Sequence, residues 1–214
     1  MGRHLPDLAR TFTAEVNESL ELVLAVEEAR TRLSPVRSQQ FRLTTARVQL
    51  AYELSYLRSF ALWETFLEET FVRYLCGYES ASGPERPVAT YCSTLSSART
   101  MVLGSKSYLL WHNPSTVITR AKQYFISGHH ETVIDASLSR LNWFAQIRHR
   151  VAHEHEDARR KFDGACMALC GRRFKSSRPG ALLREWASTP GSRTRWLEVI
   201  TKELSGLAYQ IAPV

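Results

Sequence analysis

Glycine and proline are scarce in this 214-residue sequence, with ten and eight residues respectively. That scarcity excludes a fibrous protein and argues against a largely disordered chain. No stretch approaches the about 18 consecutive apolar residues of a membrane helix, and the first residues lack the apolar core of a secretory signal. The four cysteines form no Cys-x-x-Cys pair and are too few for a disulfide scaffold. We therefore expect a globular, cytoplasmic protein that does not enter a membrane.

Acidic residues are outnumbered by basic ones, 21 against 28, which gives a net charge of +7. Of the 28 basic residues, 23 are arginines, and arginine binds phosphate in a bidentate manner that lysine does not match. Between Arg148 and Arg195, twelve basic residues face five acidic ones, so this segment accounts for the whole net charge. A run of charge is commonly a solvated face, but one that holds all the excess charge predicts a surface for a polyanion.

Apolar residues recur with helical spacing along most of the chain, and no strand is predicted. Asn113-Pro114 is a typical helix start, with Asn as N-cap and Pro in the first helical position. We expect one domain over 1–214, an all-α up-and-down helical bundle, with an irregular basic insertion over 163–192 before its last helix. The expected helices cover 5–33, 45–76, 88–103, 113–125, 131–162 and 193–211.

Two of these helices place charge on an apolar face. On a helical wheel, Arg148 lies in the middle of the apolar arc of the 131–162 helix, and Glu64 and Glu68 lie on the stripe of the 45–76 helix. We expect the two helices to face each other with Arg148 near one of the two glutamates. This arrangement is either a buried ion pair that fixes helix register or a polar cleft with a function. The arc consists of Leu138, Leu141, Phe144, Ala145, Val151 and Ala152, and the stripe of Leu50, Leu54, Leu57, Ala61, Phe71 and Leu75.

The same helix carries an Arg-x4-His spacing in Arg148-His149-Arg150-Val151-Ala152-His153. This spacing is short, and the chain contains a second match from Arg150 to His155. The position of the first match gives it weight, because it lies late in a long helix, on the apolar arc and in the cationic segment.

With two further stretches, this motif resembles the HEPN superfamily, in particular the RiboL-PSP-HEPN group and related bacterial HEPN-like nucleases. The matching stretches are Ala61-Leu62-Trp63-Glu64-Thr65-Phe66-Leu67, His112-Asn113-Pro114 and Ile147-Arg148-His149-Arg150-Val151-Ala152-His153. The resemblance implies a metal-independent ribonuclease that acts as a homodimer, in a toxin–antitoxin or antiviral defence setting with an antitoxin or other defence-system partner. The chain departs from the pattern of this family at two positions. His149 stands where many relatives have Asn or Asp, and Glu154 stands where a Gly is common.

The chemistry of RNA cleavage explains these residue types. The 2′-OH is the nucleophile, so the enzyme must remove its proton, support a negatively charged phosphorane and protonate the leaving 5′-oxygen. Histidine transfers protons near neutral pH, and arginine stabilises the extra phosphate charge. We expect Arg148 to hold the phosphate, His153 to move a proton, His149 to orient the phosphate and Glu64 to hold Arg148. No metal or other cofactor is expected, and the residues expected to bind the nucleic acid are Arg150, Arg159, Arg160, Arg172 and Arg173.

Two other functions remain open. One is a metal-dependent hydrolase, because His149-x3-His153-x-His155 with Glu154, Glu156 and Asp157 offers metal ligands; however, the His-Glu-x-x-His order is absent and Cys166-x3-Cys170 is a poor zinc knuckle. The other is a non-catalytic module that binds nucleic acid or a partner protein. We interpret the remaining histidines as surface or capping residues: His4, His112, His129 and His130. Four tryptophans are expected in the core: Trp63, Trp143, Trp186 and Trp196.

Overall fold

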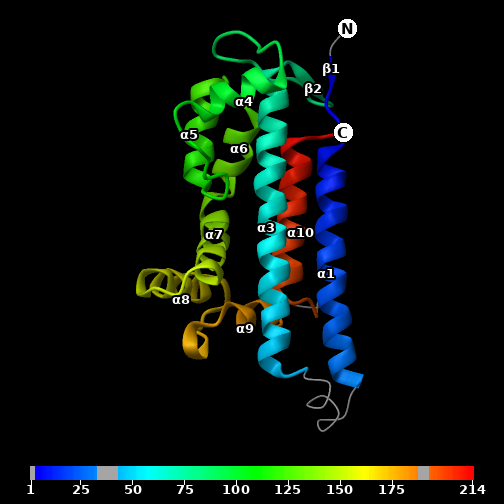
Figure 1. The fold of residues 1–214 in the computed structure, drawn as a ribbon, viewed down its shortest axis with the longest axis vertical. Coiled ribbons are helices and arrows are strands. Elements are labelled where there is room, and N and C mark those ends of the chain that lie inside the picture. Colours follow the sequence, from blue (N-terminus) through cyan, green and yellow to red (C-terminus); the bar gives the residue numbers. More distant parts are fainter. Residues whose placement is uncertain (1–2, 33–42, 188–192) are drawn as a thin grey trace. The chain divides into compact units, whose positions relative to one another are not determined.

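The computed structural model describes residues 3–32, 43–187 and 193–214 (Figure 1). The fold is all-α, as predicted. None of the described helices combines the length and the hydrophobicity of a membrane span. The α-helices are α1 (Leu8–Arg32), α3 (Thr45–Leu75), α4 (Leu95–Leu103), α5 (Pro114–Tyr124), α6 (His129–Ala136), α7 (Leu138–Ala152), α8 (Glu156–Cys170), α9 (Pro179–Arg184) and α10 (Trp196–Ile211), and a 3₁₀ turn, η1, covers Lys175–Ser177.

A small sheet of three short strands was not predicted. Strand β1 (Arg3–His4) pairs in parallel with β2 (Tyr78–Ser80), which pairs antiparallel with β3 (Gly83–Pro84). Strands of two or three residues are too short to show an alternating pattern, so periodicity could not reveal them.

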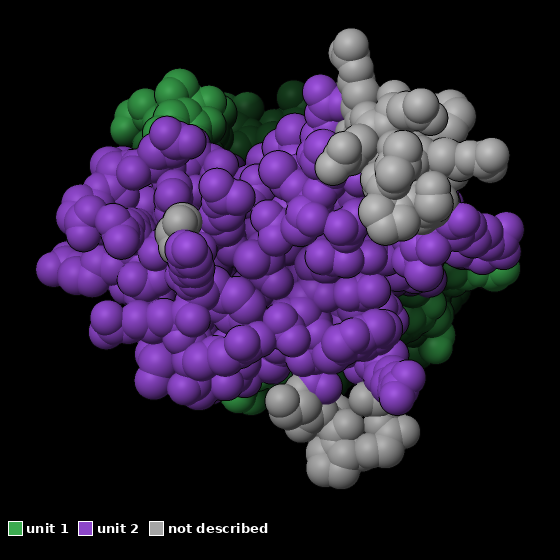
Figure 2. All heavy atoms as spheres, turned by 90° about the horizontal axis from the view of Figure 1, so that it is seen from below, with its two compact units in different colours: residues 1–13, 62–142, 204–214 green, residues 14–61, 143–203 purple. Residues whose placement is uncertain are grey.

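The residues of the chain group by their contacts in space into two compact units (Figure 2). Unit 1 comprises 1–13, 62–142 and 204–214, and unit 2 comprises 14–61 and 143–203. Helices α1, α3 and α10 each contribute residues to both units.

The core of unit 1 is aromatic. Phe12 of α1 packs on Trp63 and Phe66 of α3, with ring centroids 5.7 and 5.5 Å apart. The fully buried Phe71 makes edge contacts with Trp111 at 5.3 Å and Phe125 at 4.9 Å. Aromatic side chains bury large apolar areas and gain from edge-to-face geometry, so this cluster stabilises the second half of α3 against the segments that follow it.

In unit 2, hydrogen bonds tie the helices around the first half of α3. The buried Tyr56 of α3 donates from its hydroxyl to the carbonyl of Phe144 in α7, at 2.8 Å. Gly180, in the first turn of α9, donates its amide to Glu53 Oε1 at 2.8 Å. A Cβ at position 180 would lie 2.4 Å from the Gln49 carbonyl oxygen. Only glycine permits this approach of α9 to α3, which brings the arginine-rich segment onto that helix.

The prediction of one continuous helix over 131–162 is wrong. The structure contains three helices there, with breaks at Ser137 and at 153–155. His155 accepts the amide of Ala158 on Nδ1 at 3.2 Å and so caps α8, whose first turn contains Glu156 and Asp157. Histidine is not a typical N-cap residue, although acidic residues in a first turn are a signal of a helix start.

Two further helix predictions need correction. The helix expected from Val88 begins only at Leu95, because Thr94 and Ser97 form a capping box. The segment expected to be an irregular insertion over 163–192 is partly helical, since α8 continues to Cys170 and α9 follows. Its residues 188–192 lie outside the described residues.

The predicted stripe of α3 holds only in part, since Phe71 and Leu75 are buried but Ala61 is exposed. Leu50 and Leu54 are 50% and 58% exposed. The buried row contains Val48, Tyr52, Tyr56, Phe60, Trp63 and Phe66. Both sides of α3 carry apolar residues, and in its first half the large aromatic side chains occupy the interior because they bury more area. The hydroxyl of Tyr56 has a hydrogen-bond partner there, whereas the buried hydroxyl of Tyr52 has none.

Candidate functional site

Three histidines lie together where α7 ends and α8 begins, all in unit 2. The ring centroids of His149 and His153 are 4.7 Å apart, those of His149 and His155 are 5.2 Å apart, and those of His153 and His155 are 5.7 Å apart. We call this group the histidine cluster. The amide of His153 still donates to the His149 carbonyl, at 3.0 Å, so the helical turn extends just past Ala152 and keeps the two rings on one side.

The break between α7 and α8 is what adds His155 to the pair. In a continuous helix, His155 would lie six residues beyond His149, about 120° away from it on the wheel. The chain instead turns at 153–155, and the imidazole of His155 is fixed by its capping bond to Ala158. His155 belongs to the helix expected over 131–162, whereas the structure places it in the loop before α8.

The environment of His149 favours its neutral form. Burial lowers the pKa of His149, and the neighbouring charges of His153, His155 and Lys161 lower it further, against a smaller opposing effect of Asp157. His149 is half-buried, whereas His153 and His155 are exposed. A neutral imidazole accepts a proton, so His149 has the state that a general base requires.

Arg148 is half-buried on α7. The preceding apolar residues Leu141, Phe144 and Ile147 are buried, with at most 3% exposure, whereas Ala152 is exposed. The apolar arc therefore ends near Arg148, which is itself neither fully buried nor exposed.

Glu64 and Glu68 belong to unit 1, and the correction to the stripe of α3 changes how they are interpreted. Both are half-buried beside the aromatic row. A carboxylate oxygen of Glu64 lies 3.2 Å from His112 Nδ1, without the angle of a hydrogen bond. Glu68 accepts the indole N–H of Trp111 at 3.1 Å. The pairing of Glu64 with Arg148 stays a prediction.

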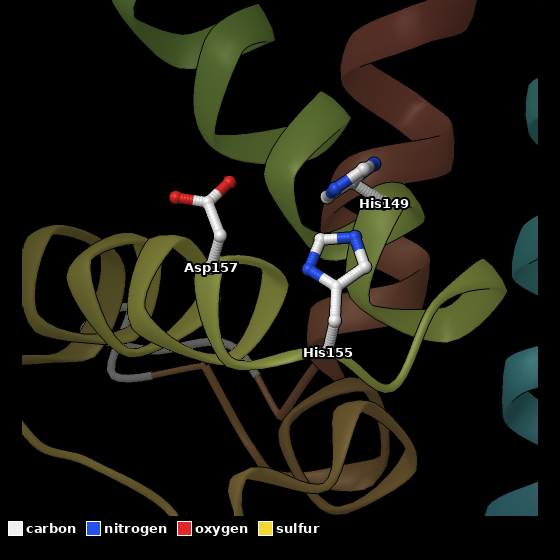
Figure 3. A group of neighbouring side chains, drawn as sticks. All are labelled: His149, His155 and Asp157. Atoms are coloured by element: carbon white, nitrogen blue, oxygen red, sulfur yellow. The ribbon is translucent and has the colours of Figure 1, made fainter.

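A group of possible metal ligands overlaps the histidine cluster. His149, His155 and Asp157 each offer one ligand atom, and these atoms all lie within 4.8 Å of one another (Figure 3). Two nitrogens and one carboxylate oxygen suit Zn²⁺.

Two of these three side chains already have protein partners. Asp157 accepts from Arg160 and Lys161, each at 2.6 Å, and its pKa is lowered by those two hydrogen bonds. Nδ1 of His155 accepts the capping bond, so a neutral His155 carries its proton on Nε2. A metal at Nε2 would require the proton to move to Nδ1, at the cost of a cap worth about 1 kcal/mol.

The five arginines expected to bind nucleic acid all lie in unit 2. Arg150 donates from Nη1 to the carbonyl of His153 at 3.0 Å. Arg159 lies 3.9 Å from Glu156, and Arg160 pairs with Asp157. Arg172 pairs with Glu185 at 2.8 Å, and Arg173 is exposed. Arg150 thus has a local role that spacing did not predict, because it holds the backbone of a cluster histidine.

Arg150 also lines a hollow of about 370 Å³ beside the cluster. Its other lining residues include Gln49, Glu53, Glu154 and Arg178, and we call it the Arg150 hollow. Glu154 follows His153 directly in the chain, so the hollow opens beside the histidine cluster.

Two histidines of unit 1 differ from the surface role expected of them. His130 is 1% exposed, and Thr70 Oγ1 and the Leu67 carbonyl lie 2.9 and 3.2 Å from its Nε2. Burial lowers the pKa of His130 to about 4. His129 hydrogen-bonds the buried carboxylate of Glu85, and this bond raises the pKa of His129.

Comparison with known proteins adds no relative to this picture. No family model matches the chain, and neither a curated protein nor a solved structure matches it.

Proposed function

We propose that this chain cleaves single-stranded RNA without a metal ion, with Arg148 and the histidine cluster as its catalytic groups. The observation that carries the proposal is the mutual contact of three imidazole rings, at 4.7 to 5.7 Å, in one chain. Cleavage by the 2′-OH needs one group to accept a proton and another to donate one. Neighbouring imidazoles supply both functions, and the excess positive charge of 148–195 attracts the phosphate backbone.

The environments of the histidines suggest a division of roles. His149, with its lowered pKa, takes the proton of the 2′-OH as the 2′-oxygen attacks phosphorus. His153, exposed at the end of α7, delivers a proton to the 5′-oxygen as the P–O5′ bond breaks. The products are a 2′,3′-cyclic phosphate and a 5′-hydroxyl. Arg148 stabilises the phosphorane, and His155 retains its capping bond to Ala158.

This assignment modifies the roles expected from the sequence. His149 becomes the general base rather than a group that orients the phosphate, while His153 remains a proton-transfer group. The resemblance to HEPN nucleases supports a homodimer and a role in toxin–antitoxin or antiviral defence in the cytoplasm. Since one chain already contains neighbouring imidazoles, the second chain is not required to supply the second proton-transfer group.

A metal-dependent hydrolase is a second candidate, favoured by the 4.8 Å grouping of His149, His155 and Asp157. The two candidates predict opposite effects of chelation. Cleavage of labelled single-stranded RNA that persists in EDTA and yields cyclic-phosphate ends supports the proposal. Activity that disappears in EDTA and returns with Zn²⁺ overturns it in favour of the hydrolase.

Variants separate the roles within the cluster. His149→Ala and His153→Ala should each abolish most cleavage and leave RNA binding intact, whereas Arg148→Ala should weaken both. His4→Ala is the matched control, because His4 is an exposed histidine of unit 1. If none of these variants differs from the wild type, or if the chain binds RNA without cleaving it, the catalytic proposal fails and the binding-module function replaces it.

A further inference from the structure

A second hollow of unit 2 combines arginine with aromatic side chains. It measures about 330 Å³, and its lining residues include Gln49, Arg172, Phe174, Trp186 and Arg195. We call it the Trp186 hollow. Trp186 was expected in the core, but the structure leaves it 48% exposed. Its exposed indole lies next to the cationic side chains that line the hollow.

The aromatic rings of this hollow are each paired with a guanidinium group. The Arg195 guanidinium carbon lies 4.1 Å from the Trp186 ring centroid, and that of Arg172 lies 4.9 Å from the Phe174 ring centroid. Residues Trp186 and Arg195 face each other in an antiparallel bridge, flanked by the hydrogen bond from the Ala187 amide to the Thr194 carbonyl at 2.8 Å. The backbone therefore holds the indole and its cation in a fixed arrangement.

A buried carboxylate holds two arginines of the hollow in place. Glu27, 8% exposed, accepts two hydrogen bonds from Arg184 at 2.6 and 2.7 Å and lies 3.7 Å from Arg195. Burial raises the pKa of Glu27, but Arg184 and Arg195 outweigh it, so the net pKa lies below its usual value. Arg195 also donates to the Arg184 carbonyl at 2.5 Å. These guanidinium groups are thus ordered before any ligand binds, which lowers the entropic cost of binding.

The charges of the hollow leave a positive balance. Arg172, Arg184 and Arg195 face the carboxylates of Glu27 and Glu185, so three positive charges meet two negative ones. The side chain of Arg172 is 57% exposed and can approach a phosphate while it keeps its packing on Phe174. An anion with an attached flat ring fits this combination of a positive balance and an exposed indole.

The two hollows of unit 2 adjoin, because Gln49 lines both. Glu154, which lines the Arg150 hollow, follows the cluster histidine His153 directly in the chain.

We infer that the Trp186 hollow binds an unpaired base of a single-stranded RNA, with the base stacked on Trp186 and an adjoining phosphate at Arg172. This inference rests on the proposed function and specifies its substrate, since a base held in a duplex cannot stack on a protein ring. Stacking is largely independent of base identity because every base has a π-face, so the hollow sets the strand state of the substrate rather than its sequence.

Binding of a deoxyoligonucleotide tests the hollow apart from the chemistry, because a strand without 2′-OH groups is not cleaved by the proposed route. Titration of the full chain with an oligothymidylate should show a loss of affinity of about tenfold for Trp186→Ala, from the stacking of one base. Trp186→Phe should retain most of the affinity, because it keeps an aromatic face. Tyr108→Ala is the matched control, since Tyr108 is 69% exposed but lies in unit 1.

The outcomes distinguish the hollow from the catalytic proposal. Normal affinity in Trp186→Ala, with a thermal melting curve like the wild type, overturns the stacking site even if the protein cleaves RNA. Equal losses for Trp186→Phe and Trp186→Ala also overturn it, because then the indole acts only through packing. Tenfold weaker binding of Trp186→Ala by a chain that cleaves nothing sustains the hollow and refutes the ribonuclease.

Discussion

The two units of this chain place neighbouring histidines in opposite environments. His129 and His130 in unit 1 hydrogen-bond Glu85, Thr70 and Leu67, and His130 is buried beside the aromatic rings of Phe71 and Tyr74. The histidine cluster of unit 2, about twenty residues later in the sequence, lies at the end of a helix, where its rings contact one another. His130 is enclosed by the core of unit 1, whereas two of the three cluster histidines are exposed and therefore available for chemistry.

The largest expected effect comes from replacing one histidine in each unit and comparing the two variants in activity and stability. His153→Ala should lower the cleavage rate by about 10²–10⁴-fold, the usual contribution of an acid–base group. Because His153 is exposed, its loss should change the free energy of unfolding by about 0.5 kcal/mol or less. Single-turnover cleavage and urea unfolding measure the two effects on the same samples. A His130→Phe variant that lost as much activity as His153→Ala, at full stability, would contradict the division between the units.

Two carboxylates of unit 2, the buried Glu27 and its neighbour Glu28, should differ in what they contribute to stability. Glu27→Gln removes the negative charge that holds Arg184 and Arg195, and should lower the free energy of unfolding by about 3 kcal/mol. Glu28→Gln, one residue along α1, is the control, because its pair with Arg32 is exposed and should cost about 0.5 kcal/mol or less. Chemical denaturation midpoints compare the two, and similar midpoints would show that the Glu27 cluster contributes no stability.

The buried His130 of unit 1 should also make the free energy of unfolding depend on pH. The pKa of His130 is about 4 in the folded chain and about 6.5 in an unfolded one. As the pH falls below about 6.5, the unfolded chain takes up a proton that the folded chain refuses until about pH 4. Stability should therefore decline through this window, by about 3 kcal/mol in total. His130→Phe should flatten the curve of unfolding free energy against pH, and an unchanged slope would refute the assignment.

The smallest expected effect concerns Arg150, which touches the cluster only through the backbone. Arg150→Ala removes the hydrogen bond to the His153 carbonyl and should lower the cleavage rate about fivefold, in line with a net hydrogen bond of about 1 kcal/mol. Arg150→Lys should restore part of that loss. A fall as large as that of His153→Ala would make Arg150 and His155, the second Arg-x4-His match, the functional pair.

Local signals in the sequence predicted the start of α5 but missed that of α4, although both helices begin with a typical N-cap residue. Asn113 and Pro114 marked the start of α5, and the Asn113 side chain does accept the amide of Thr116. The start of α8 was missed because its cap is a histidine. The signal that could have found it is the acidic pair Glu156 and Asp157, which follows His155 and favours a helix N-terminus.

Burial was predicted less well than helix position, and α3 shows why. Its sequence offers two apolar sides, and the helix alone has no means to choose between them. The choice depends on partners such as Phe144 in α7, which accepts the hydroxyl of Tyr56. With the wrong side chosen in the first half of α3, Leu50 and Leu54 were placed in the interior although they are exposed. Glu64 and Glu68 are half-buried, and the pairing of Glu64 with Arg148 stays a prediction.

The sequence by itself determined the helical class, the cationic segment from Arg148 to Arg195 and the close spacing of His149 and His153, because periodicity, charge and one helical turn are local properties. Tertiary structure decided that His155 joins the cluster, that His130 is buried and that Trp186 remains exposed beside Arg195. It also brought Glu27 to Arg184, 157 residues apart in the chain. Burial and long-range pairing depend on which surfaces meet, and no single segment contains that information.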